Sequence, residues 1–168
     1  MNLDKLIEAI RAEYALSWDG LHGISHWTRV RENGLRLAER TGAQIVVVEC
    51  FAYLHDAKRI NDGRDPGHGR RGAALARSFQ GTLLDLTDEQ MELLAYACSY
   101  HTDGLTEADV TVQTCWDADR LDLGRVGKRP LADKLCTPAA RDPAVIEWAW
   151  ERSQQGQVWS VPLHRQHT

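Results

Sequence analysis

Residues 45–72, IVVVECFAYLHDAKRINDGRDPGHGRRG, begin as an almost continuous apolar run and turn polar at His55. Apolar residues on nearly all sides predict a buried, central helix over residues 43–58. The segment NDGRDPGHG, residues 61–69, is rich in glycine, proline and aspartate and predicts a loop. A central helix that ends on a histidine, an aspartate and further charges either leaves the core there or contributes to a metal site.

Helical spacing of apolar residues dominates the rest of the chain, and alternating strand patterns are almost absent. Gly42 is placed to close one helix in the left-handed conformation, and TDEQ at 87–90 has the pattern of a capping box that starts another. The further helices that we expect cover residues 1–16, 21–40, 67–80, 87–100, 107–112, 116–123 and 143–154. Residues 124–130 are predicted to form a loop, and the tail after Gly156 is predicted to be irregular. The fold class is therefore all-α.

The length of 168 residues fits a single compact helical domain over residues 1–168. The formal charge of −4 gives no reason to expect an extended nucleic-acid surface or binding to an anionic membrane. The N-terminus lacks the continuous apolar centre of a signal peptide, and the longest apolar run is about half of what a bilayer crossing requires. We therefore expect a cytoplasmic protein that could form a homodimer.

Four cysteines, Cys50, Cys98, Cys115 and Cys136, are scattered along the chain without a Cys-x-x-Cys pair. This distribution suggests neither a zinc knuckle nor a disulfide framework. Three of them fall in helical or apolar contexts, where a free thiol behaves as a small hydrophobic group.

Five of the seven histidines lie in the first two thirds of the chain, several at the ends of expected helices: His22, His26, His55, His68 and His101. His55 extends the apolar face of its helix, and His101 does the same on another helix. A lone histidine in such a place is more often a core residue bonded to a backbone carbonyl. Several imidazoles that converge beside carboxylates, however, are best satisfied by a divalent cation.

Taken together, these motifs resemble the HD-domain superfamily of metal-dependent phosphohydrolases. The motif order of that superfamily is a histidine, a His-Asp dyad, two optional histidines and a distal aspartate, on an all-helical core. The matching residues here are His26 in LHGISHWTRV, His55 and Asp56 in YLHDAKR, His68 in DPGHGRRGA, His101 in CSYHTDG and Asp117 in CWDADRLDLGR. The resemblance covers about residues 21–124, the motif-bearing core, and leaves the C-terminal helix and tail, 125–168, outside it.

The resemblance implies a metal site between core helices that binds one or two divalent transition metals. One metal would bind His26, His55, Asp56 and Asp117, and a second would bind His68 and His101, with Asp56 as a bridge. Mixed nitrogen and oxygen ligands do not choose among Mn, Fe, Co, Ni, Zn and Mg. His22 competes with His26 as a ligand, and it could instead line the pocket. Asp119 and Asp122 are alternatives to Asp117, and Asp62 and Asp65 could also reach the site.

Basic residues cluster around the dyad of an otherwise acidic chain: Lys58, Arg59, Arg64, Arg70 and Arg71. Guanidinium groups and the amides at a helix start both suit phosphate oxygens, although such runs are more commonly solvated loops. We expect Asp56 and Lys58 to be catalytic. The expected substrate-binding residues are Arg59, Arg70, Arg71 and His22.

The resulting hypothesis is a metal-dependent phosphohydrolase that cleaves a small phosphorylated substrate, a phosphate ester or a nucleotide, through a metal-activated water. Two alternatives remain open. The first is chemical: the ligand set of this chain also resembles that of the di-iron oxygenases of the same superfamily. The second is that the chain keeps the fold as a non-catalytic nucleotide-binding module. Phosphate-complementary arginines favour hydrolysis.

Overall fold

The computed structural model describes residues 1–155, which form helices joined by loops. The helices are α1 (Leu3–Glu13), α2 (Ile24–Thr41), α3 (Ile45–Leu54), α4 (His68–Phe79), α5 (Asp88–Tyr100), α6 (Val110–Arg120), α7 (Pro138–Arg141) and α8 (Pro143–Gln154), with the 3-10 helices η1 (Leu123–Val126) and η2 (Ala132–Lys134) between α6 and α7. Within residues 1–155, β structure is limited to one bridge between Gln80 and Leu84. The prediction of an all-α fold is confirmed.

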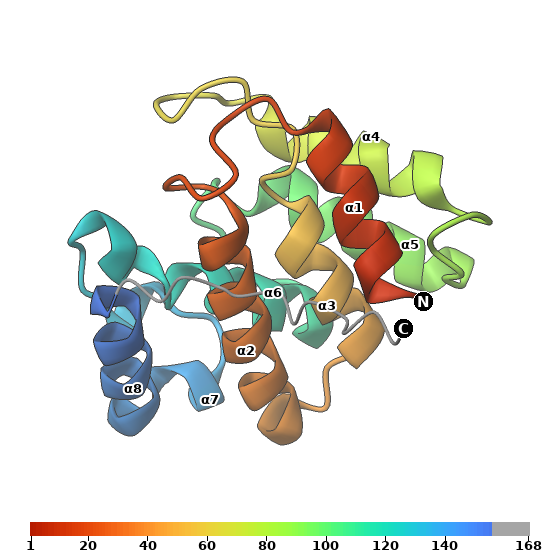
Figure 1. Ribbon diagram of the computed structural model, residues 1–168. Helices are drawn as coiled ribbons and strands as arrows, with labels where there is room; N and C mark the ends of the chain where they lie inside the picture. Colours follow the sequence, from red (N-terminus) through yellow and green to blue (C-terminus); the bar gives the residue numbers. More distant parts are fainter. Residues whose placement is uncertain (156–168) are drawn as a thin grey trace, which may run out of the picture.

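Helix α3 lies at the centre of the molecule (Figure 1). It contacts α2 on one side and α5 and α6 on others, and its residues from Cys50 to Leu54 are all buried. Gly34 of α2 permits the close approach of α2, since a Cβ there would lie 2.4 Å from Val48 Cγ1. The apolar run therefore forms the buried central helix that its composition predicts.

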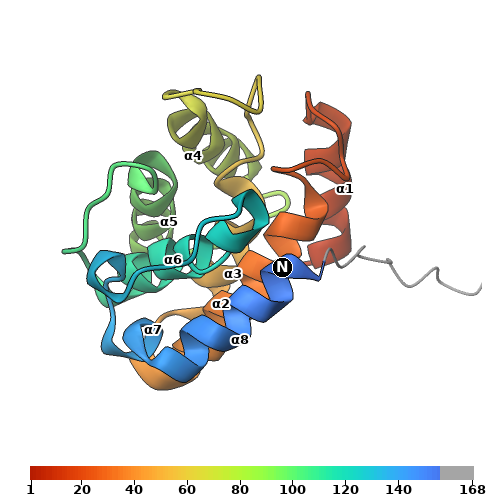
Figure 2. The same cartoon turned by 90° about the vertical axis from the view of Figure 1, so that its left-hand side faces the viewer.

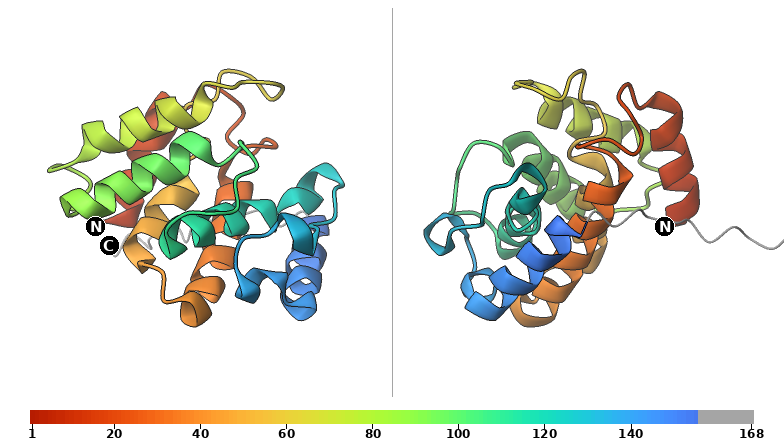
Figure 3. Two further views of the ribbon diagram at one scale, coloured as in Figure 1. Left: turned by 180° about the vertical axis from the view of Figure 1, so that it is seen from behind. Right: turned by 60° about the vertical axis from the view of Figure 1, so that its left-hand side comes forward.

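Helices α4 and α5 run side by side along one edge of the molecule (Figure 3). Helices α7 and α8 lie away from them, beside α2 (Figure 2). There they bury a second, smaller apolar cluster around Leu37 of α2 and Leu121. No helix within residues 1–155 is both long and apolar enough to span a bilayer.

Several predicted helix ends are confirmed. Thr87 and Gln90 form both hydrogen bonds of a capping box at the start of α5, and Gly42 ends α2 with φ of 73°. Helix α8 begins at Pro143 as expected. The predicted irregular tail after Gly156 lies outside the described residues.

Three predictions about the elements are wrong. The central helix ends at Leu54 instead of continuing to residue 58, because residues 55–59 form turns with bonds from Ala57 N to Leu54 O and from Arg59 N to Asp56 O. The two short helices expected over 107–112 and 116–123 are the single helix α6. Thr114 does not interrupt α6, because its hydroxyl donates to Val110 O within the helix. The predicted loop over 124–130 begins within η1.

Candidate metal centre

Helix ends bring seven ionisable side chains together in the interior. We call them the His-Asp cluster: His22, His26, His55, Asp56, His68, His101 and Asp119. His22 precedes α2 and His26 lies in its first turn, while His68 is the first residue of α4. His55 and His101 cap the C-terminal ends of α3 and α5. Asp119 comes from α6. The cluster therefore forms only where the five helices α2 to α6 meet.

Each of four imidazoles is oriented by a hydrogen bond at its Nδ1 atom. His55 Nδ1–H donates to Phe51 O at 3.0 Å, and His101 Nδ1–H donates to Cys98 O at 2.7 Å. His68 Nδ1–H donates to a carbonyl too, that of Asp65. His26 Nδ1–H donates to the Asp122 carboxylate at 2.7 Å. Because these partners only accept, the proton of each neutral ring lies on Nδ1 and the Nε2 atom carries a lone pair.

The unprotonated Nε2 atoms face one another in two pairs. His26 Nε2 lies 3.1 Å from His55 Nε2, and His68 Nε2 lies 3.0 Å from His101 Nε2. Two lone pairs in van der Waals contact repel each other unless a positive charge lies beside them. Neutral imidazole with its second nitrogen hydrogen-bonded is the arrangement in which histidine binds metals. The donor set therefore fits a divalent cation.

Two carboxylates complete the cluster. Asp56 Oδ2 lies 3.8 Å from both His26 Nε2 and His55 Nε2, and its other oxygen, Oδ1, lies 3.0 Å from His68 Nε2. Asp119 Oδ1 lies 3.4 Å from His26 Nε2 and 3.8 Å from His55 Nε2. Nitrogen and oxygen donors in such a mixture suit first-row transition metals.

The protonation states of the cluster agree with this reading. Burial lowers the pKa of His55 to about 4, and burial together with the Arg125 guanidinium lowers that of His26 well below its ordinary value. Burial opposes ionisation of Asp56, but the surrounding imidazoles outweigh it and hold the Asp56 pKa well below its usual range. At neutral pH, neutral rings thus face an ionised carboxylate, which is the form that binds metal.

His101 behaves differently from His26 and His55. Burial disfavours its charged form, but the nearby carboxylates of Asp56 and Asp119 outweigh burial and raise the pKa of His101. His101 can therefore hold a proton more readily than His26 or His55.

The comparisons with known proteins agree with this geometry. No protein-family model matches the chain, and no curated protein matches its sequence. A crystal structure of a predicted HD superfamily hydrolase from an uncultured Thermotogales bacterium is similar, with a TM-score of 0.66 and 27% sequence identity. The match covers 90% of this chain and 92% of the other. This chain belongs to the HD superfamily.

The distal aspartate of this HD protein is not where the sequence analysis placed it. Asp117 is fully buried and accepts hydrogen bonds from Cys136 N at 2.6 Å, and from Thr137 N and Thr137 Oγ1 at 2.8 Å. Its carboxylate thus fixes the segment that leads into α7. Asp119 faces the imidazoles instead, because two residues along a helix turn the side chain to the other side. The prediction of Asp117 is therefore corrected to Asp119, which the sequence analysis kept as an alternative.

Two residues that support the cluster were missed or left undecided. Asp122, considered only as another distal aspartate, is buried and accepts from His26 and from the Arg29 guanidinium, at 2.6 Å from Arg29 Nε to Asp122 Oδ1. Arg125 was read as part of a loop, yet its guanidinium lies 4.0 Å from Asp119. The motif DRLDLGR, residues 119–125, offered only the spacing of its charges as a signal.

The predicted basic residues divide into those at the cluster and those away from it. Arg59 is buried and contacts both Asp56 and His68. Lys58, the expected catalytic residue, forms an ion pair with Glu13 at 3.0 Å instead. Arg71 donates to Lys58 O and to the Asp65 carboxylate, so it ties the 55–68 segment together. The expected catalytic role of Lys58 and binding role of Arg71 are thus not supported by their positions.

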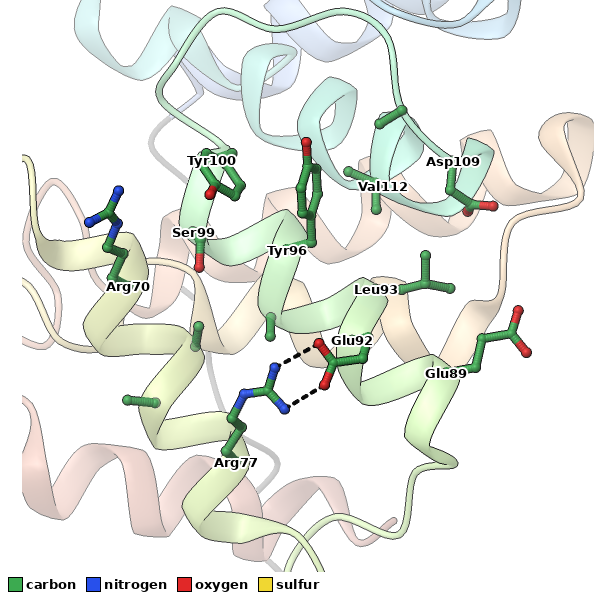
Figure 4. Close-up of a pocket in the computed structure, with 14 residues that line it drawn as sticks. Arg70, Arg77, Glu89, Glu92, Leu93, Tyr96, Ser99, Tyr100, Asp109 and Val112 are labelled. Atoms are coloured by element: carbon green, nitrogen blue, oxygen red, sulfur yellow. Dashed lines mark hydrogen bonds and ion pairs between the residues drawn. The ribbon is translucent and has the colours of Figure 1, made fainter.

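Arg70 lies in a groove of about 730 Å³ on the outer side of α4 and α5 (Figure 4). Tyr96 lines the same groove, and the paired Arg77 and Glu92 span it with two hydrogen bonds of 2.8 and 2.9 Å. The groove is lined by side chains other than those of the His-Asp cluster. The groove is therefore distinct from the His-Asp cluster. Arg70, which lines the groove, lies away from the cluster, and its expected substrate-binding role there is not supported.

Proposed function

We propose that this HD protein is a metal-dependent phosphohydrolase that cleaves a small phosphate ester or a nucleotide. The observation that carries the proposal is the facing pair of unprotonated Nε2 atoms of His26 and His55 beside two carboxylates. Buried imidazoles and carboxylates without a cation would be costly to keep in this arrangement. The similar structure from the Thermotogales bacterium, itself described as a predicted hydrolase, agrees with hydrolytic chemistry.

The residues that would hold the cation are His26, His55, Asp56 and Asp119. A divalent cation bound there supplies Lewis-acid chemistry, which activates water at neutral pH and draws charge from a phosphoryl oxygen. His22 Nδ1–H donates to Asp56 Oδ2 at 2.9 Å and so orients the Asp56 carboxylate. We assign His22 this orienting role, in place of direct metal binding.

Arg125 supports an anionic substrate. Its Nε atom is buried and has no hydrogen-bond partner within residues 1–155, while its Nη1 donates to Asp122 O at 3.0 Å and its Nη2 lies 4.0 Å from Asp119. Asp119 and His22 are the most exposed members of the cluster, with 17% and 10% of their side chains accessible. We expect a phosphate group that approaches from this side to meet the positive charge of Arg125, which has a donor still unpaired at Nε. The narrow exposure favours a small substrate over a polymer.

The test measures metal content and hydrolysis in one preparation. Plasma mass spectrometry gives the metal per chain, and phosphate release from monoesters and nucleotides, together with p-nitrophenol release from a diester, is followed with Mn, Co, Ni or Mg added. We expect metal-dependent cleavage that Asp56→Ala abolishes. Asp62→Ala, on the exposed part of the adjoining loop, is the matched control and should retain it. Arg125→Gln should raise KM for the phosphate ester more than it lowers metal content.

Other results would overturn the proposal. Two irons per chain with oxygen consumption and no ester cleavage would indicate the oxygenase chemistry known in the superfamily. Bound metal with nucleotide binding but no turnover would indicate a non-catalytic module. A wild-type chain that binds no metal would remove the basis of the proposal.

A further inference from the structure

The Asp56 carboxylate divides the His-Asp cluster into two halves. Oδ2 faces His26 and His55, which Asp119 joins from α6. Oδ1 faces His68 at 3.0 Å and His101 at 3.6 Å. A two-metal site would need a cation in each half, with Asp56 as the bridge. The two halves differ in what else lies beside them.

A guanidinium group already lies in the second half. Arg59 Nη1 is 3.4 Å from Asp56 Oδ1 and 3.3 Å from His68 Nε2. These are the two atoms that a second cation would need most, one oxygen and one nitrogen. Since an arginine only donates, both atoms accept from Arg59, and the lone pair of His68 is used in that hydrogen bond.

The position of Arg59 is fixed by the loop that follows it. Its Nη2 donates to Gly63 O at 2.7 Å and its Nε donates to Asn61 O at 3.3 Å. The loop is closed by Gly63 N, which donates to Asn61 Oδ1 at 2.8 Å. Arg59 is 7% exposed, so the guanidinium is a built part of the centre and not a surface group that happens to reach it.

We infer that Arg59 takes the place of a second cation, so that this HD protein binds one divalent metal per chain. The inference rests on the proposed metal-dependent function and specifies its cofactor. A second divalent cation at Asp56 Oδ1 and His68 Nε2 would lie next to a permanent positive charge and would have to displace two hydrogen bonds. Arg59 thereby supplies a positive charge opposite the first metal, in the place where a second cation would lie.

Metal stoichiometry tests this without reference to activity. The chain is freed of metal, loaded with Mn and analysed by plasma mass spectrometry and by electron paramagnetic resonance, in which two neighbouring Mn ions give an exchange-coupled signal. We expect one Mn and an uncoupled signal for the wild type. Arg59→Met removes the charge and keeps the length of the side chain, and it should bind two Mn with a coupled signal. Arg59→Lys keeps a charge and should remain at one.

Two further variants keep the test decisive if Arg59→Met folds poorly. His68→Ala in the wild-type background should leave the content at one Mn. If His68 were a ligand of a second metal, the same substitution would lower the content from two Mn to one. Arg70→Met, an exposed arginine of the same segment, should behave as the wild type. Two Mn in the wild type would overturn this inference and leave the proposed function standing, while no Mn in the wild type would overturn both.

Discussion

Two aspartates of α6 have different surroundings, and we expect one to bind the proposed metal and the other to stabilise the fold. Asp119 faces the imidazoles, and Asp117 holds the backbone at Cys136 and Thr137. We expect Asp119→Asn to lose stoichiometric metal and to keep the stability of the metal-free chain. Asp117→Asn should lose about 1–3 kcal/mol of the free energy of unfolding, because an amide donor then meets buried donors, and should retain its metal. Urea unfolding of metal-free protein and metal analysis distinguish the two, and metal loss in the Asp117 variant alone would contradict the assignment.

Asp122 orients His26, one of the proposed metal ligands. Its carboxylate accepts from His26 Nδ1–H and from Arg29, which fixes both the tautomer and the direction of the ring. Loss of such a partner typically costs about 10–100-fold in metal affinity. We expect Asp122→Asn to weaken metal binding by that order in competition titrations with a chelating dye. Asp133→Asn, an exposed aspartate of η2, is the control, and equal affinity in both variants would refute the role.

At the level of elements, glycines on α4 let helix ends meet closely enough to form the cluster. A Cβ at Gly72 would lie 2.3 Å from Leu54 O, and one at Gly69 would lie 2.2 Å from Cys98 O. These carbonyls are in the last turns of α3 and α5, next to His55 and His101. The spacing of α4 from these two helices is therefore set by backbone contact.

We expect Gly72→Ala to lower the free energy of unfolding by about 1–3 kcal/mol, because the backbone of Leu54 must shift to admit a methyl group. The same shift should weaken metal binding, since it moves the dyad. Gly63→Ala, where a Cβ meets only Asn61 Oδ1 at 3.4 Å, is the matched control. The unfolding temperatures of both variants are compared by thermal denaturation without metal. Equal temperatures would show that α4 can move away from α3 at little cost in free energy.

For the whole molecule, the proposed metal centre links elements that are far apart in sequence. His26 of α2, Asp56 after α3 and Asp119 of α6 lie in separate parts of the chain, so a cation bound by all three binds only the folded state. Ligand present at 100 times its dissociation constant should add about 2.7 kcal/mol of stability. We expect the unfolding temperature to rise with added Mn and to fall with a chelator. The Asp119→Asn variant should show neither shift, and a metal-induced shift in that variant would place the site elsewhere.

Much of this architecture is determined by local sequence. The apolar run of residues 45–54 predicts the central helix, and the capping box at Thr87 predicts the start of α5, because periodicity and caps act within a few residues. The sequence also predicted His26, the His55-Asp56 dyad, His68 and His101 as candidate ligands, from the order in which they occur. The structure brings these five residues together.

Tertiary packing decided what spacing alone could not. Asp117 and Asp119 lie two positions apart on α6, roughly 200° around the helix, and only the packing of α6 against α2 and α3 selects the one that faces the imidazoles. Lys58 and Arg59 are neighbours, yet the turns after Leu54 direct one to Glu13 and the other to Asp56. The sequence by itself determined the all-α class and the chemical types at the centre. Which acid and which base reach it depended on contacts between distant elements, since the direction of a side chain is set by the packing of its whole helix or turn.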